Sequence, residues 1–268
     1  MLPVPRLFKY VKAKTAITIL ENRALQWSTV DSFNDPFEFK RPFAYSFKWD
    51  EMTEVALHRY ARILTQPAKF QLLAQQWKED TVRDAGNWRE IKKAYLVLCL
   101  SAVHNHILMW SHYADNHRGA VLGFRPIIQL GGTTRLATTT LFARPVAYSL
   151  EVPIAATLEE YVEYLIGEKA KPDASEAFEK SAYTKSSVWA YENEWRVLEK
   201  KRTGDEGPFA YREFHPQELD SVYLGCRMLP GDRKRIIDLV ASWEAPVSLF
   251  QMKDDPTRFE LRLELISN

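Results

Sequence analysis

Residues 259–265 alternate strictly between apolar and charged side chains. The apolar positions are Phe259, Leu261, Leu263 and Leu265, and the charged positions are Glu260, Arg262 and Glu264. A period of two residues is typical of a β-strand that packs one face against a core and turns the other toward water. The pattern therefore predicts a half-buried antiparallel strand, and a chain with such a strand must build a sheet around it.

Other segments add strands and helices to this sheet. The run Tyr95–Leu100 (YLVLCL) is almost continuously apolar, which is typical of a strand buried on both faces. Further strands are expected at 6–10, 25–28, 120–124, 138–148, 194–198 and 221–226, and helices at 16–25, 105–116, 157–166 and 233–243. The strands come in runs and do not alternate regularly with helices. We therefore predict an α+β fold with a mostly antiparallel mixed β-sheet and flanking helices.

Residues 50–95 contain few breakers and carry aromatic and aliphatic residues at helical spacing. We interpret them as a helical insertion in a single α+β domain that spans residues 1–268. Residues 31–36 (DSFNDP) form a turn before it, because Pro36 disfavours helical backbone at Asp35. Residues 167–183 are polar and are expected to form an exposed helix or loop.

Composition narrows the class of protein without indicating its chemistry. The 268 residues carry 36 Lys and Arg against 35 Asp and Glu, a net charge of +1, which argues against non-specific nucleic-acid binding. No apolar run approaches the roughly 18 residues of a membrane span, and the first residues carry no signal-peptide core. The two cysteines, Cys99 and Cys226, cannot form a disulfide framework. We expect a cytoplasmic protein with no membrane partner.

Common catalytic and nucleotide-binding motifs are absent from the sequence. The glycine motifs of P-loop and Rossmann folds do not occur, and neither do G-x-S-x-G or H-E-x-x-H. The candidate chemistry therefore depends on three local motifs.

A histidine-rich stretch is the first motif. Its members fall within fourteen residues and are His104, His106, His112, Asp115 and His117. Imidazole and carboxylate groups bind zinc, but His112 and His117 are five residues apart and diverge on a helix. The alternative is that these two histidines cap or hydrogen-bond near a helix C-terminus, where the helix dipole favours them.

The second motif is Asn34–Glu38 (NDPFE). Asp35 and Glu38 either project into a cleft or belong to a rigid turn that the Asp35 side chain closes with a hydrogen bond.

The third motif is Trp189–Arg196 (WAYENEWR). Glu192 and Glu194 are two residues apart just before a strand, and on extended backbone they point to the same side. Like charges so close raise the pKa of one carboxyl unless a cation compensates, and Lys185 and Arg196 are near in sequence. Such a carboxylate can hold a ligand hydroxyl or stabilise a developing cation. The alternative is a surface cluster of ion pairs.

The order of motifs along the chain resembles that of a known family. The segments RLFKY, NDPFE, MWSHYADNHRG and YENEWR are followed by an LGCR strand. Across nearly the whole chain this order is similar to the bacterial domain-of-unknown-function family 2971, whose name implies no chemistry.

The opening strand, helix and strand (FKY, AITILENRAL, LQWS) resemble the start of the ADP-ribosyltransferase fold. The resemblance implies NAD as substrate, gripped by Lys9 or Arg6 where that fold has His or Arg. It equates Ser28–Thr29 with a Ser-Thr-Ser element and Glu192–Glu194 with a Glu-x-Glu element. Glu194 is then the catalytic residue that stabilises the oxocarbenium-like charge, and Glu192 orients or deprotonates the acceptor nucleophile.

The same resemblance implies how NAD is bound. An aromatic ring from the site (Tyr10, Trp110, Tyr113 or Tyr191) stacks on nicotinamide or adenine. Lys9, Lys185 or Arg196 pairs with the pyrophosphate. The residues expected to bind NAD are Lys9, Tyr10, Ser28, Asn34, Asp35, Trp110, His112, Tyr113, Lys185 and Arg196.

Three functions follow as hypotheses. The first is an NAD-dependent ADP-ribosyltransferase, a toxin or phage-defence effector that modifies a protein or nucleic acid. The second is a non-catalytic module that binds a nucleotide or nucleic acid, with Glu194 tied up by Arg196 or Lys185. The third is a metal-dependent nuclease built on Asp35, Glu38, His112 and His117. The sequence does not fix the oligomeric state.

Overall fold

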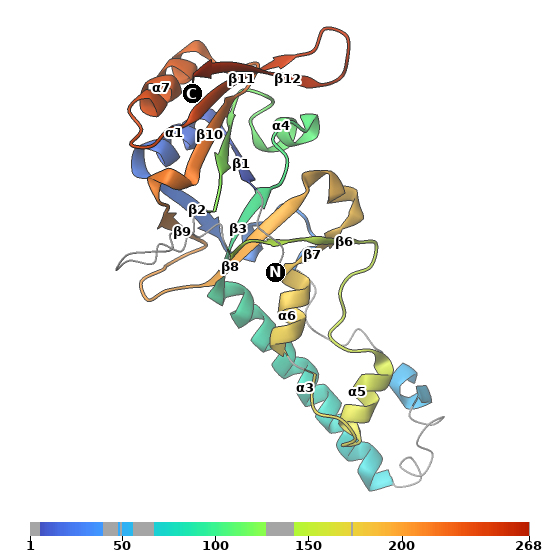
Figure 1. The fold of residues 1–268 in the computed structure, drawn as a ribbon. Helices are drawn as coiled ribbons and strands as arrows, with labels where there is room; N and C mark the ends of the chain where they lie inside the picture. Colours follow the sequence, from blue (N-terminus) through green and yellow to red (C-terminus); the bar gives the residue numbers. More distant parts are fainter. Residues whose placement is uncertain are drawn as a thin grey trace. The chain divides into compact units, whose positions relative to one another are not determined.

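The fold is that of a computed structural model, which describes residues 6–39, 48, 50–55, 67–126, 142–172 and 174–267 (Figure 1). The chain divides into two compact units. Unit 1 comprises Met1–Ser28, Leu96–Val146 and Val188–Asn268, and unit 2 comprises Thr29–Tyr95 and Ala147–Ser187. The segment expected to be a helical insertion, residues 50–95, lies in unit 2 together with Ala147–Ser187.

A mixed, mostly antiparallel sheet forms the framework of unit 1. Its strand order is β12-β11-β10-β4-β1-β3-β2-β9, and β8 pairs with β3 and with β5. The strands are β1 (Leu7–Val11), β2 (Ala24–Ser28), β3 (Tyr95–Ser101), β4 (Ala120–Phe124), β5 (Arg144–Pro145), β8 (Glu194–Lys200), β9 (Phe209–Glu213), β10 (Leu219–Leu224), β11 (Ser248–Asp254) and β12 (Leu261–Ser267). β10 and β11 are parallel, and the helix α7 (Pro230–Ala241) connects them. The predicted α+β class is confirmed.

Both faces of this sheet are covered, and β1 shows how. Leu7 and Val11 belong to one apolar cluster, whereas Phe8 and Tyr10 belong to another, because successive residues of a strand point to opposite faces. The first cluster takes in side chains of α1 (Ala13–Asn22) and of α7. The second takes in Trp110 from the helix α4 (Ile107–Tyr113). Helices therefore pack on both faces of the central strands.

The end of α4 depends on an unusual backbone. Three consecutive residues after it, Asp115, Asn116 and His117, have positive φ values of 50°, 53° and 68°. Gly119, which follows these residues, is needed for a different reason, since a Cβ there would lie 2.1 Å from the carbonyl oxygen of Val11. Gly119 therefore permits close packing against β1.

The C-terminal alternation gives a strand, but that strand is not half-buried as predicted. β12 pairs antiparallel with β11, as expected. However, Leu263 and Leu265 are 47% and 52% exposed. β12 is the outermost strand, and its leucines extend the sheet face of the buried Met252 beyond the packed core. The two-residue period correctly identified the strand. It did not predict burial, because burial depends on which other elements cover the face that carries the leucines.

Unit 2 is mainly helical. Its elements are the 3-10 turn η1 (Val30–Ser32), α3 (Pro67–Ala94), α5 (Leu158–Leu165), α6 (Ala174–Ala182) and the parallel pair β6 (Ala147–Ser149) and β7 (Thr184–Ser186). Residues 50–55 are also helical, as predicted, and 56–66 lie outside the described residues. Thr157 begins α5 with a capping box to Glu160. The expected exposed segment 167–183 is partly wrong, because Phe178 of α6 is buried against Trp88 and Tyr95.

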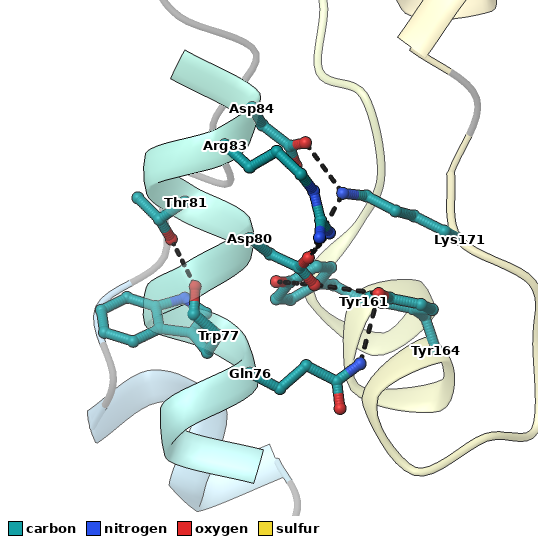
Figure 2. A network of polar contacts seen from close by, with 9 residues as sticks. All are labelled: Gln76, Trp77, Asp80, Thr81, Arg83, Asp84, Tyr161, Tyr164 and Lys171. Carbon is teal, nitrogen blue, oxygen red and sulfur yellow. Dashed lines mark hydrogen bonds and ion pairs between the residues drawn. The ribbon is translucent and has the colours of Figure 1, made fainter. Parts of the chain in front are cut away.

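A buried polar network joins α3 to α5 in unit 2 (Figure 2). Asp80 and Asp84, one helical turn apart on α3, are only 1% and 7% exposed. Lys171 Nζ lies 2.8 Å from Asp84 Oδ1 and 3.4 Å from Asp80 Oδ1. The Tyr164 hydroxyl donates to Asp80 Oδ2 over 2.9 Å, and Arg83 also pairs with Asp80. Buried carboxylates need such partners, so the network fixes how α3 and α5 pack.

Candidate functional site

Two of the three sequence motifs meet at the end of β3 in unit 1. Tyr113, the last residue of α4, donates its hydroxyl to Glu192 Oε1 over 2.6 Å. Glu192 ends the 3-10 turn η3 (Ser187–Glu192), and its carbonyl oxygen accepts from Ser101 Oγ over 2.6 Å. Ser101 Oγ in turn accepts from the Val103 amide over 3.1 Å. These bonds fix Glu192 at the junction of η3, β3 and α4.

Glu194 begins β8 and is held by an arginine of the same strand. Arg196 Nε lies 2.8 Å from Glu194 Oε1, and Arg196 Nη2 donates to Oε2 over 3.0 Å. Glu194 is 5% exposed and Arg196 is fully buried. This two-point geometry is the strong form of an ion pair and fixes the orientation of the carboxylate.

Cys99 of β3 lies beside this ion pair. Burial raises the pKa of the Cys99 thiol, and the charge of Glu194, to which the thiol is hydrogen-bonded, raises it further. Cys99 therefore stays protonated and supplies a donor to Glu194.

The expectation that both glutamates lie on extended backbone is wrong. Glu192 belongs to η3, and Asn193 between the glutamates has a φ of 44°. The left-handed backbone at Asn193 turns the chain between the two glutamates, so their side chains have different neighbours. Glu192 contacts Tyr113, whereas Glu194 contacts Arg196.

β1 contributes a lysine and a tyrosine near the same end of β3. Lys9 Nζ donates to the Cys99 carbonyl oxygen over 2.8 Å. Tyr10 donates its hydroxyl to the Val103 carbonyl oxygen over 2.9 Å, and burial raises the pKa of this phenol. The Tyr10 ring lies edge-on to Trp110, with centroids 5.7 Å apart. Trp110, one of the rings expected to stack on NAD, is fully buried and is therefore a core residue.

Ser28 lies on the same side of the sheet as Tyr10, whereas Lys9, the neighbour of Tyr10 on β1, starts from the opposite side. Ser28 is opposite Val97 in the β2–β3 pair, two residues along β3 from Cys99. Directly opposite residues and alternate residues of a strand share a face, so Ser28, Cys99 and Ser101 share one. The step from Val97 to Cys99 is about 7 Å along the strand.

Unit 1 thus contains nine of the expected site residues. They are Lys9, Tyr10, Ser28, Trp110, His112, Tyr113, Glu192, Glu194 and Arg196. His112 is exposed on α4, its ring edge-on to that of Tyr113 at 6.3 Å. Arg6, the alternative to Lys9, pairs instead with the buried Asp220 at 2.7 Å.

The other three expected site residues, Asn34, Asp35 and Lys185, lie in unit 2. Asp35 Oδ1 accepts from the Phe37 amide over 2.8 Å, which is the turn-closing bond of the alternative interpretation. Lys185 Nζ forms a buried ion pair with Glu38 Oε1 at 3.2 Å. Lys185 and Glu38 therefore neutralise each other inside unit 2.

The histidines occupy aromatic surroundings. His104 stacks on Tyr223 with centroids 4.6 Å apart, and His117 stacks on Trp110 at 6.3 Å. Burial lowers the pKa of both imidazoles, which favours their neutral forms. Among the described residues, no three His, Cys, Asp or Glu side chains are grouped so that they could hold a metal ion.

Sequence reasoning missed one residue of this region, Ser101, and one contact, that of His106 with Tyr191. Ser101 links Glu192 to β3, and its partner is 91 residues away in the chain. His106 stacks on Tyr191 with centroids 5.1 Å apart and an interplanar angle of 18°. Neither contact has a local sequence signal, although Ser101 is the first polar residue after the apolar run of β3.

The comparison with protein families bears on the segment that contains these contacts. Residues 109–197 match the family model described as protein of unknown function (DUF2971). The match covers about a third of the chain and includes MWSHYADNHRG and YENEWR, the motifs joined by the Tyr113–Glu192 bond. The expected family resemblance is confirmed for this segment, and NDPFE lies outside it. Comparisons with curated proteins and with solved structures gave no significant match.

The helices were also compared with the requirements of a membrane span. Within the described ranges, none has both the length and the hydropathy needed to cross a bilayer.

Proposed function

We propose that the chain is an NAD-dependent ADP-ribosyltransferase whose reacting groups lie in unit 1. One observation carries the proposal. Glu192, the last residue of η3, and Glu194, the first residue of β8, lie with Lys9 and Tyr10 of β1 around the end of β3. Ser28 of β2 shares its sheet face with Tyr10 and Cys99. These are the three elements that the resemblance to the ADP-ribosyltransferase fold singles out.

The chemistry requires a carboxylate near the ribose. The bond between nicotinamide and ribose C1 breaks, and its electron pair leaves with nicotinamide. Positive charge then develops on the ribose, and Glu194 opposes it. Arg196 orients Glu194 through a two-point ion pair, so the carboxylate needs little reorganisation during the reaction.

Glu192 has a separate role in this proposal. The acceptor nucleophile forms the new bond to ribose C1 and gives its proton to the Glu192 carboxylate. Tyr113 donates to Glu192 Oε1 and positions it. The acceptor is a protein or nucleic acid with a nucleophilic side chain or base.

Of the three residues expected to pair with the pyrophosphate, Lys9 is the one in unit 1 that is not held, among the described residues, in a buried ion pair with a glutamate. Arg196 is fully buried against Glu194, and Lys185 pairs with Glu38 in unit 2. Lys9 is half-buried and donates to a carbonyl oxygen, a bond that it can exchange for one to the NAD pyrophosphate.

A specific observation favours a second candidate function. The buried Glu194–Arg196 pair compensates the negative charge that would stabilise the oxocarbenium-like ribose. A carboxylate so paired suits a module that binds a nucleotide without cleaving it. Lys9 and the partly exposed Tyr191 would then contact phosphate and base.

The experiment measures free nicotinamide after incubation of the purified chain with NAD and a cell lysate as a source of acceptors. We expect Glu192→Gln and Glu194→Gln to lose at least about 100-fold in rate. Glu206→Gln, which removes an exposed loop carboxylate, is the matched control and keeps the wild-type rate.

Each outcome assigns one function. Release by the wild type that both glutamate variants lose supports the transferase. Absence of release together with a thermal shift caused by NAD supports the binding module. Absence of both contradicts either function.

A further inference from the structure

β12 gives the unit 1 sheet an open edge. It is the terminal strand of the sheet order, and β11 is its only partner among the described residues (Figure 1). The backbone groups on its outer side therefore have no strand partner within the described part of the chain. Proteins usually protect such edges with short strands, prolines or bulges, because an open edge pairs readily with another chain.

β12 has one such bulge and no proline. Residues 261–265 pair regularly with β11, and the bulge falls beyond them, at Ile266 between the pairs Leu249–Ser267 and Phe250–Leu265. Leu263 and Leu265 are about half exposed on one face of this regular stretch. A straight edge with exposed leucines is suited to receive another strand.

The sequence of this stretch is complementary to itself. The centre of this stretch is Leu263, which Arg262 precedes and Glu264 follows. Leu261 and Leu265 lie one residue further out on either side. When two copies pair antiparallel about Leu263, Arg262 of one copy lies opposite Glu264 of the other, twice. Every leucine then lies opposite a leucine. Directly opposite pairs of unlike charge or of apolar side chains stabilise antiparallel strands.

The charged side chains are positioned to reach a second copy. The side chains of Arg262 and Glu264 are 57% and 56% exposed. Within the chain, Arg262 Nε lies 3.2 Å from Asp255 Oδ2, and Glu264 pairs with Lys253. Exposed pairs of this kind are weak and leave both groups able to accept a second partner.

We infer that the partner of this edge is a second copy of the chain, joined by antiparallel pairing of the two β12 strands about a twofold axis at Leu263. The two sheets become one continuous sheet across the dimer. A twofold axis makes both halves of the interface identical, which the arrangement of Arg262 and Glu264 requires.

Charge exchange tests this inference with the full chain, by light scattering coupled to size-exclusion chromatography. The wild type is expected to be a dimer. Arg262→Glu and Glu264→Arg each place like charges opposite one another twice, and each weakens dimerisation by roughly tenfold or more. The double variant R262E/E264R restores unlike pairs, and its dimer returns.

The double variant separates this interface from effects within one chain. It breaks both internal pairs, Arg262 with Asp255 and Glu264 with Lys253, so a merely internal role does not predict that its dimer returns. Hydrogen exchange of wild-type amides 261–265, measured against protein concentration, provides a test without substitution. We expect slower exchange at higher concentration.

Several outcomes overturn the inference. These are a wild type that is monomeric at all concentrations, a dimer that single exchanges do not weaken, and a folded double variant that stays monomeric. Exchange at residues 261–265 that is independent of concentration also contradicts it.

Discussion

Arg196 holds Glu194 from two residues along the same strand, with Nε 2.8 Å from Oε1 and Nη2 3.0 Å from Oε2. Both side chains are buried, and the ion pair offsets the free-energy cost of taking each charged group out of water. Any account of Glu194 as a reacting group must therefore include Arg196.

The first prediction concerns the stability of this pair. Glu194→Gln or Arg196→Met alone leaves one buried charge without its partner and lowers the free energy of unfolding by about 3–5 kcal/mol. The free energy of unfolding of the neutral double variant E194Q/R196M falls by much less than the sum of the losses of the two single variants. Urea unfolding of all four proteins gives the coupling energy. Additive losses would show that the two groups do not stabilise each other.

The second prediction concerns the network of unit 2. Lys171→Met leaves Asp80 and Asp84 buried with less positive charge nearby and lowers the free energy of unfolding by about 2 kcal/mol or more. Adding Asp84→Asn recovers part of the loss, because one buried negative charge is removed. Lys180→Met, which breaks an exposed pair with Glu176 on α6, is the control and costs at most about 1 kcal/mol. Equal losses for the two lysine variants would sink this interpretation.

The third prediction concerns close backbone packing after α4. An alanine Cβ at position 119 would lie 2.1 Å from the Val11 carbonyl oxygen, so β1 or the turn must move. Gly119→Ala should therefore lower the melting temperature by several degrees, since it costs about 2 kcal/mol or more. Gly231→Ala in the first turn of α7 meets no atom within 4 Å and should leave the melting temperature unchanged or slightly raised. A thermal melt of both variants decides between these outcomes.

The fourth prediction concerns acid stability. Hydrogen bonds from the Arg212 side chain and then from the Arg202 amide lower the pKa of Asp205 from 3.8 to about 2. A carboxyl whose pKa is lower in the folded state stabilises the fold above its unfolded pKa. That contribution is lost as the pH falls through the folded pKa. Wild-type stability should therefore fall between about pH 4 and pH 2 more steeply than that of Asp205→Asn.

Urea midpoints measured across this pH range provide the test. Glu206→Gln, which removes a neighbouring exposed carboxylate, should follow the wild-type curve. Identical slopes for wild type and Asp205→Asn would contradict the stabilising role of the Asp205 contacts.

Local patterns predicted the elements of the fold better than their burial. The strand β3 followed from its apolar run, and α5 lies within the helix expected at 157–166. The alternation of β12 also identified a strand, yet its leucines are exposed. Burial depends on neighbours from distant parts of the chain, and a period of two residues contains no information about them.

The site shows the same limit. YENEWR contains an ion pair, as its alternative interpretation had it, but the Glu194–Arg196 pair is buried and does not lie at the surface. The placement of Glu192 required Asn193 to adopt positive φ and Tyr113 to approach from 79 residues away. Lys185, close in sequence, pairs with Glu38 in the other unit. Sequence proximity therefore indicated one true partner of the glutamates and one false one.

The most direct test of the proposed function uses the charge-neutral pair E194Q/R196M, because it removes the carboxylate without leaving a buried charge. Nicotinamide release from NAD is measured for this variant and for the wild type at equal folded fraction. We predict release by the wild type and a loss of at least about 100-fold in the double variant. A folded double variant that releases nicotinamide at the wild-type rate, or a wild type that releases none, would contradict the assignment of Glu194 as the catalytic carboxylate.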